Sequence, residues 1–415
     1  MLNTIRIAWK NLLRYQRRTV LTSLLITVGI IAVLLFISVS GSFKAMMIGQ
    51  ITDSMLGHIQ IHKRGYVSSI DNLPLHMNMK PRMMEKVREA LAEQDNVEAY
   101  SERIKFGAMF SNFTETTNIR LNAVAPEDEA KTVPLLAGRI IEGEKEGALL
   151  SKGKILIPEI IAKGLKVKPG DTVVLVANNK DGSVNGLTFE VQGILEGISG
   201  PGGRDGYMHI DDARTLLRID EEDVSEVAVR LKNPDKLEDT FASLKNTMSQ
   251  YINQQGKPAF EVHKWEKLSP FSNIADMIDL LTLFIKIMLV SIVLISVMNV
   301  MVMAVYERIR EIGTISAIGT LPGRILSLFV MEGLLLGVVG TVAGTVISLV
   351  TIFILNMNQL TFSFGRQQNL VLTPTISTIE VLVVCSVVIG VAILASVQPA
   401  WKASRMDPID ALRHL

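Results

Sequence analysis

Two residue pairs and one glycine-rich run in this sequence could support chemistry. His58 and His62 flank the tripeptide Ile-Gln-Ile and could bind a metal ion together. Asp276 and Asp279 could act as a carboxylate pair, and residues 197–206 could bind a phosphate through backbone N–H groups. Each group needs partners of a particular type, so the rest of the sequence decides whether the chemistry is available.

These partners are missing from the sequence. The six histidines have no cysteine neighbours and no His-Glu-x-x-His motif, so we expect no metal site. The glycine-rich run lacks the Lys-Ser/Thr of a Walker A motif, and no such motif occurs elsewhere. We therefore expect residues 197–206 to be a flexible loop that could contact a partner, and the chain to be no enzyme in its own right. Asp276 and Asp279 are three positions apart, and acidic residues with this spacing on an exposed helix are typical of a solvated face.

The elements that must position functional residues are mostly membrane helices. Hydrophobic residues make up 48% of the chain. The formal net charge of +1 gives no indication of nucleic-acid binding, and the lone cysteine, Cys385, cannot form a disulfide within the chain. Four apolar stretches reach the roughly 20 residues that cross a bilayer. They predict spans over residues 19–44, 286–306, 326–356 and 380–401. The first is too long for a signal peptide, so we expect it to be retained.

Basic residues near the spans predict their orientation. Residues 1–18 hold five basic residues and no acid, and the segments 307–325 and 402–415 hold three basic residues each. The loop of residues 357–379 has only Arg366. We therefore expect both termini and residues 307–325 in the cytoplasm, and residues 45–285 and 357–379 on the outer side.

Residues 45–285 predict a mixed α+β domain. The alternation at His58–His62 is typical of an edge strand, and Pro81–Gln94 has the spacing of a helix. Closely spaced strands and turns predict a β-rich subdomain inserted at about residues 150–220. The proline-free stretches beside the first two spans are expected to form stalk helices.

The segment Glu307–Gly319 could receive force from a soluble partner. It directly follows the uncharged run Ile287–Tyr306, and Gly319 and Pro322 predict a turn before a second helix. A short helix–turn–helix along the membrane is a docking shape. The alternative is that its charges only mark the membrane boundary.

This segment also resembles a family signature. Glu307-Arg-x-Arg-Glu-Ile-Gly313, followed by Ala317-x-Gly319, is similar to the cytoplasmic signature of the MacB/LolC/FtsX family of ABC transporter permeases. The tail Pro399–Arg413 and the order of one span, a large domain and three spans also resemble this family. Gly57–His62 is most similar to its lipoprotein-releasing LolC/LolE-like branch. MacB itself differs, because an ATPase domain precedes its first span.

The resemblance implies partners and roles. It implies two permeases on a dimer of separate ABC ATPase subunits, which bind ATP and Mg while this chain binds no cofactor. It also implies that the ATPases push the cytoplasmic loops and that the stalks move the periplasmic domains, which take substrate from the membrane lipid or the periplasm. The residues implied for ATPase coupling are Glu307, Arg308, Arg310, Glu311, Gly313, Ala317, Gly319 and Arg324.

Glycines in the third predicted span indicate close helix packing. Gly337, Gly340 and Gly344 recur every three or four residues, and the last two form a Gly-x-x-x-Gly motif. We expect them to pack against the second or fourth span of the same chain. A seam between two permeases is the alternative.

Three functions fit this sequence. The permease could release lipoproteins from the inner membrane of a diderm bacterium, or it could drive MacB-like efflux of small molecules or peptides with an outer-membrane partner. It could also be an FtsX-like transmitter that activates a periplasmic hydrolase. The length of residues 45–285 counts against the transmitter, because FtsX-type domains are much smaller. The second permease could be an identical chain or a paralogue.

Overall fold

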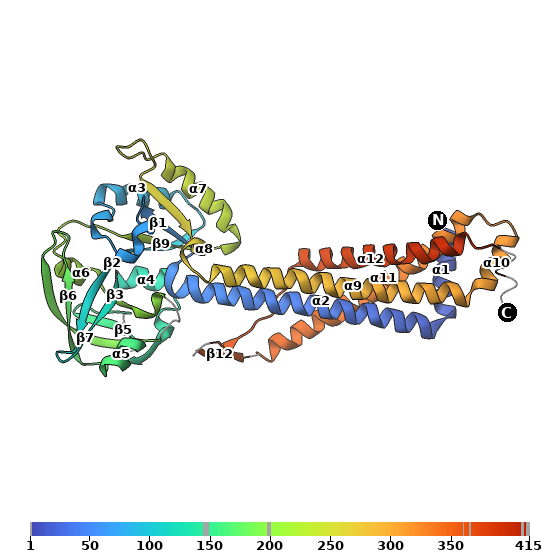
Figure 1. Cartoon of the computed structure of the whole chain (residues 1–415), viewed down its shortest axis with the longest axis horizontal. Coiled ribbons are helices and arrows are strands. Elements are labelled where there is room, and N and C mark those ends of the chain that lie inside the picture. Colours follow the sequence, from blue (N-terminus) through green and yellow to red (C-terminus); the bar gives the residue numbers. More distant parts are fainter. Residues whose placement is uncertain are drawn as a thin grey trace. The chain divides into compact units, whose positions relative to one another are not determined.

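The computed structural model describes residues 2–143, 149–196, 201–359, 361–364, 367–407 and 411 (Figure 1). The chain forms two compact units: unit 1 comprises Met1–Met46 and Ala275–Leu415, and unit 2 comprises Met47–Ile274. Residues 197–200 of the glycine-rich loop, Arg366 and residues 408–410 and 412–415 of the tail lie outside the described residues.

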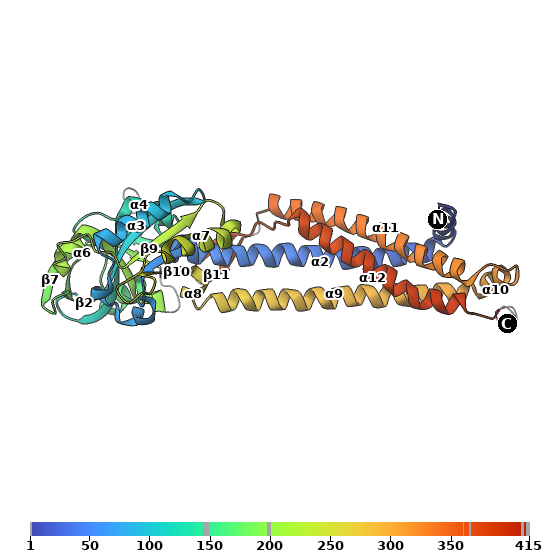
Figure 2. The ribbon, with the colours of Figure 1, turned by 90° about the horizontal axis from the view of Figure 1, so that it is seen from above.

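Unit 1 consists mainly of long helices (Figure 2). Among the described residues, four helices are long and apolar enough to cross a membrane, and each contains one of the predicted spans. They are α2 (Gln16–Ile51), α9 (Ser272–Glu307), α11 (Pro322–Met357) and α12 (Thr378–Ser404). The shorter elements are α1 (Leu2–Arg14), α10 (Ile309–Ala317), β11 (Thr361–Phe364) and β12 (Gln367–Val371).

Glycines of α11 allow two neighbouring helices to approach it closely. A Cβ built on Gly337 would lie 2.8 Å from the Cβ of Ala392 in α12. Cβ atoms built on Gly340 and Gly344 would lie 2.7 Å and 2.8 Å from the Cβ atoms of Ile26 and Ile30 in α2. Gly337 therefore faces the fourth span, as expected, whereas the Gly-x-x-x-Gly motif faces the first span, where we had expected the second or the fourth. A run of small residues predicts a close approach but does not identify the partner helix.

Helices α2 and α9 run side by side in unit 1 (Figures 1 and 2). The hydroxyls of Ser40 and Thr282 lie 2.9 Å apart, and the Lys44 ammonium donates to the Asp279 carboxylate at 2.5 Å. Asp279 was expected on a solvated face. It is 60% exposed, yet its carboxylate contributes to the contact between these two helices.

One half of unit 2 is an antiparallel sheet covered by helices. Its strand order is β10-β1-β9-β2, and side chains from α3 and α7 pack on its core residues Ile59 and Ile61. The elements are β1 (Ile59–Lys63), β2 (Val97–Ser111), β9 (Glu226–Leu231), β10 (Phe260–Lys264), α3 (Pro81–Ala92), α7 (Leu237–Ser249) and α8 (Trp265–Leu268).

The prediction of an edge strand at His58–His62 is wrong. Strand β1 pairs with β9 on one side and β10 on the other, so it is an inner strand. His58 is 6% exposed and His62 is fully buried, with its ring stacked on Tyr66 at 5.4 Å between centroids. Alternation marks one buried face of a strand, and here the face with the polar side chains is covered as well.

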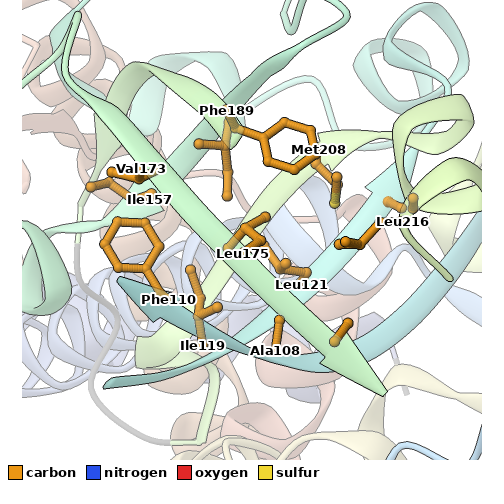
Figure 3. Close-up of a cluster of buried hydrophobic side chains, with 14 of the residues drawn as sticks. Ala108, Phe110, Ile119, Leu121, Ile157, Val173, Leu175, Phe189, Met208 and Leu216 are labelled. Atoms are coloured by element: carbon orange, nitrogen blue, oxygen red, sulfur yellow. The ribbon is translucent and has the colours of Figure 1, made fainter. Parts of the chain in front are cut away.

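The other half of unit 2 is a small closed barrel. Its pairings run β2–β3–β8–β5–β7–β6 and return to β2, which leaves none of these strands as a free edge. Figure 3 shows side chains from opposite walls meeting inside: Phe110, Ile119, Leu121, Leu175, Phe189 and Met208. The remaining strands are β3 (Thr116–Val124), β5 (Lys154–Pro158), β6 (Thr172–Asn178), β7 (Val184–Leu195) and β8 (Asp205–His209).

Helices α5 (Glu159–Leu165) and α6 (Ile210–Leu217) add side chains to the barrel core. Strand β4 (Ile140–Gly143) pairs with β7, and helix α4 (Pro126–Thr132) follows β3. The core draws on residues from Ile104 to Ile219. It begins well before the region of about 150–220 that the turn pattern had predicted, because β2 and β3 are needed to close the barrel.

Strand β2 belongs to both halves, and Arg103 lies where they meet. Its residues up to Arg103 pair with β9, and those from Arg103 onward pair with β3. The Arg103 side chain is 1% exposed and forms ion pairs with Glu129 of α4 at 2.8 Å and Glu226 of β9 at 3.1 Å. It also donates to the carbonyl oxygen of Met55 at 2.7 Å.

The charges around Glu226 act on its ionisation. Burial alone would raise the pKa of this carboxyl, but the Lys105 ammonium, the His62 ring and the Arg103 guanidinium outweigh it. The pKa of Glu226 is therefore held below its ordinary value of 4.5.

Candidate coupling site

The predicted coupling segment is a short helix between two sharp breaks. Helix α9 ends at Glu307, and Arg308 has the non-helical angles φ −114° and ψ 19° before α10 begins. Gly319 has φ +95°, which only glycine adopts at low cost, and α11 begins at Pro322 after the extended residue Leu321. The segment therefore has the helix–turn–helix form that its glycine and proline residues predicted.

Arg308 lies at the centre of a charge network inside unit 1. Its side chain is 5% exposed, and its Nη1 donates to Oε1 of Glu332 in α11 at 2.8 Å. Its Nε donates to Oε2 of Glu311 in α10 at 3.0 Å. The guanidinium carbon lies 5.7 Å from the ring centroid of Tyr15 and 5.5 Å from that of Phe329, both within cation–π range.

Helix α1 contributes to the same network. The side-chain amide of Asn11 donates to Oε1 of Glu332 at 2.7 Å, and the Tyr15 hydroxyl, just after the helix, donates to Oε1 of Glu311 at 3.2 Å. Arg14 lies 3.5 Å from the same oxygen of Glu311. The network therefore joins the end of α9, helix α10, helix α11 and the N-terminal segment.

The network also sets the charge state of Glu311. Partial burial would raise the pKa of this carboxyl, but the hydrogen bond and positive charge of Arg308 hold it below its ordinary value. The network therefore favours the ionised form of Glu311.

The eight residues implied for coupling divide into two groups. Arg308 and Gly313 are buried and Glu311 is partly exposed, so these three face the chain's own network. The other five are exposed on the outer face of the segment: Glu307, Arg310, Ala317, Gly319 and Arg324. The same outer face displays Ile318 at 80% exposure and Leu321 at 65%.

Several residues of this site were not among those implied for coupling. Glu332 lies within the predicted third span, and a carboxyl group inside an apolar span is by itself an indication of a functional contact. Nothing in the local sequence pairs Asn11 or Tyr15 with residues some 300 positions away.

A buried charge network therefore lies beneath exposed apolar and basic residues of this segment. No cluster of three or more His, Cys, Asp or Glu side chains that could hold a metal ion occurs in the part of the chain that the structure describes.

The long apolar helices and the separate two-part α/β unit are those of a membrane protein with a large folded domain. The model of the MacB-like periplasmic core domain matches residues 19–247, more than half of the chain, and that of the FtsX-like permease C-terminal region matches residues 283–408. The chain belongs to the MacB/LolC/FtsX-type family of ABC transporter permeases, and it is a multi-pass inner-membrane protein with a periplasmic domain.

Relatives with different stated roles are similar to this chain. The lipoprotein-releasing system transmembrane protein LolC of Neisseria meningitidis is 23% identical, over 94% of this chain and 92% of that protein. The macrolide export ATP-binding/permease protein MacB of Hahella chejuensis is 25% identical, over 98% of this chain and 59% of that protein. The periplasmic region of MacB from Actinobacillus actinomycetemcomitans is 12% identical, over 51% of this chain and 92% of that structure, with a TM-score of 0.35.

Proposed function

We propose that this permease releases lipoproteins from the inner membrane, driven by a separate ATPase subunit that docks on the outer face of α10 and the turn after it. Both termini and this segment then lie in the cytoplasm, and ATP and Mg are bound by the ATPase. The observation that carries the docking proposal is the exposure of Ile318 and Leu321, at 80% and 65%, in a segment that also exposes Arg310 at its start and Arg324 after its turn. An apolar centre with an arginine rim is typical of a protein interface.

The buried side of the segment would carry the movement onward. A push on α10 reaches α11 and α1 through Arg308, and reaches α9 through the main chain at Glu307. Helix α9 is continuous over Ser272–Glu307, and its contacts with α2 at Thr282 and Asp279 lie near its other end. The movement would therefore pass along a pair of joined helices.

The docking step can be tested with one exposed apolar residue. Ile318→Asp should abolish the stimulation of ATP hydrolysis by the permease, because it places a charge at the centre of the proposed interface. Ile252→Asp is the matched control, since Ile252 is 65% exposed in unit 2. Unchanged stimulation in correctly folded Ile318→Asp protein would remove this segment from the coupling step.

Glu311 is a poor residue for this test. Charge reversal there would break its contacts with Arg308 and Tyr15 inside the permease, so a loss of coupling would have two explanations. Arg324→Glu is the better charge reversal, because the Arg324 side chain is exposed.

The substrate needs a separate experiment. Similarity to LolC over 94% of the chain supports lipoprotein release, and similarity to MacB over 98% supports efflux as the second candidate. Depletion of the permease should leave lipoproteins stranded in the inner membrane. Normal lipoprotein sorting with increased sensitivity to small toxic compounds would rule out lipoprotein release and support efflux as the function.

The second permease of the complex can be identified by co-purification. Two differently tagged copies of this chain should purify together if the working unit is a homodimer. Recovery of a different permease in place of the second copy would indicate a paralogue.

A further inference from the structure

Helix α1 packs on unit 1 with only one of its faces. Ala8 and Leu12 are buried, at 0% and 3% exposure, in the face that contacts α11. Ile5, Trp9 and Leu13 recur every four residues and form a separate apolar stripe along the helix. This stripe is 40%, 46% and 54% exposed at its three residues, so the packing of unit 1 does not account for it.

A basic stripe lies next to the apolar one. Arg6, Lys10 and Arg14 each follow a residue of the apolar stripe by one position, which places them about 100° further around the helix. All three side chains are exposed. Residues 1–18 contain no acidic residue, and Glu311 of α10 lies 3.5 Å from Arg14 at one end of the stripe.

The two stripes together have the pattern of a helix that lies in a membrane surface. Such helices bury an apolar face at the boundary of the acyl chains and place Lys and Arg among the headgroups. Tryptophan is enriched at this depth, and Trp9 lies in the middle of the apolar stripe. An acidic protein segment could also bind a basic and apolar surface, so the position of the helix has to decide between these partners.

The position of α1 favours lipid. It ends at Arg14, and the membrane-crossing stretch of α2 begins at Thr19, so four residues separate them. The five peptide steps from Arg14 to Thr19 span at most about 18 Å. The Arg14 end of the basic stripe is therefore held near the headgroups of the bilayer that α2 crosses.

We propose that α1 is a binding surface for anionic phospholipid. Arg6, Lys10 and Arg14 bind lipid phosphate groups, and Ile5, Trp9 and Leu13 insert beside the acyl chains. The surface requires neither an ATPase nor a lipoprotein, so it stands or falls independently of the function proposed above.

Lipid bound to α1 would also reach the coupling network. Asn11 on the packed side of the helix donates to Glu332, and Arg14 lies beside Glu311. Anionic lipid would hold α1 in place, and α1 in turn positions both carboxylates for Arg308.

Trp9 provides a direct test in the full-length protein. The chain has three tryptophans, so Trp265→Phe and Trp401→Phe leave Trp9 as the only one. This protein is placed in phosphatidylcholine nanodiscs that contain increasing fractions of phosphatidylglycerol with brominated acyl chains. Brominated phosphatidylcholine serves as the parallel quencher. We expect the anionic lipid to quench Trp9 at the lower mole fraction, and 1 M salt to remove the difference because it shortens the Debye length to about 3 Å.

Charge variants of the same protein test which residues bind. Each basic residue near a bilayer contributes about 1 kcal/mol, so Arg6→Gln with Lys10→Gln should raise the half-quenching mole fraction roughly fivefold per charge. Lys402→Gln with Arg405→Gln removes the same charge elsewhere and should leave it unchanged. Equal quenching by both lipids would overturn the anionic preference. Quenching by neither lipid, in protein that melts normally, would overturn the lipid proposal and point to a protein partner.

Discussion

Breaking the ion pair between Arg308 and Glu332 is the most informative perturbation of the coupling site. The change Arg308→Met keeps most of the side-chain volume but leaves Glu332 with Asn11 as its donor. Removal of one partner from a buried pair typically costs about 3–5 kcal/mol. The Glu332 side chain is 1% exposed, and its remaining hydrogen bond to Asn11 favours the lower end of that range, about 3 kcal/mol.

This loss can be measured by thermal unfolding of the purified protein in detergent. For a unit of this size, 1 kcal/mol shifts the melting temperature by about 2–4 °C, so Arg308→Met should lower it by roughly 6–12 °C. The double variant Arg308→Met with Glu332→Leu should recover most of the loss, because it removes both buried charges together.

Arg310→Met is the matched control, since Arg310 is exposed two residues further along. It should melt within about 2 °C of the wild type, because exposed charges contribute little. The reasoning is refuted if Arg308→Met melts like this control, or if the double variant is less stable than Arg308→Met alone.

Three further outcomes follow from the packing and charges. Gly340→Leu should cost about 1–3 kcal/mol, because its Cβ would lie 2.7 Å from Ile26, whereas Gly390→Leu, with nothing within 4 Å of its Cβ, should melt like the wild type. Unit 2 should lose stability as the pH falls below 4.5, because the pKa of Glu226 is depressed in the folded state. Glu226→Gln should make the stability of unit 2 depend less on pH in this range, measured by unfolding followed through the fluorescence of Trp265. Gly57→Ala should lower the stability of unit 2 by about 1–3 kcal/mol in the same assay, because φ is +71° and the new Cβ would lie 2.9 Å from a carbonyl oxygen of β9. Unchanged stability would show that this position is not strained.

The elements of this protein could be predicted where the spacing of hydrophobic residues follows a single pattern. The four apolar stretches became α2, α9, α11 and α12, and Pro81–Gln94 became α3 because Met84, Val87 and Leu91 all face one core. These signals are local, since each residue is placed relative to near neighbours in the sequence.

The features that could not be predicted depend on contacts between distant residues. The barrel closes through pairings such as β3 with β8, whose partners Arg120 and Asp205 are far apart in the chain, and alternation does not specify which strands pair. Arg308 was predicted at the site, but its buried position depends on Glu332 and Tyr15, which come from two other segments. The sequence therefore indicated the segment but could not separate its inner face from its outer face.

The strand that passes from the sheet into the barrel has a mechanical consequence. Strand β2 changes partners at Arg103 without a break in its hydrogen bonding, and the buried Arg103 side chain holds α4 and β9 against it. Bending between the two halves of unit 2 would have to distort β2 and disturb the ion pairs of Arg103, so we expect the halves to move together. Any torque applied to the sheet should rotate the barrel with it as one stiff body, and a probe in the β6–β7 turn, over residues 179–183, would report the motion of the whole of unit 2.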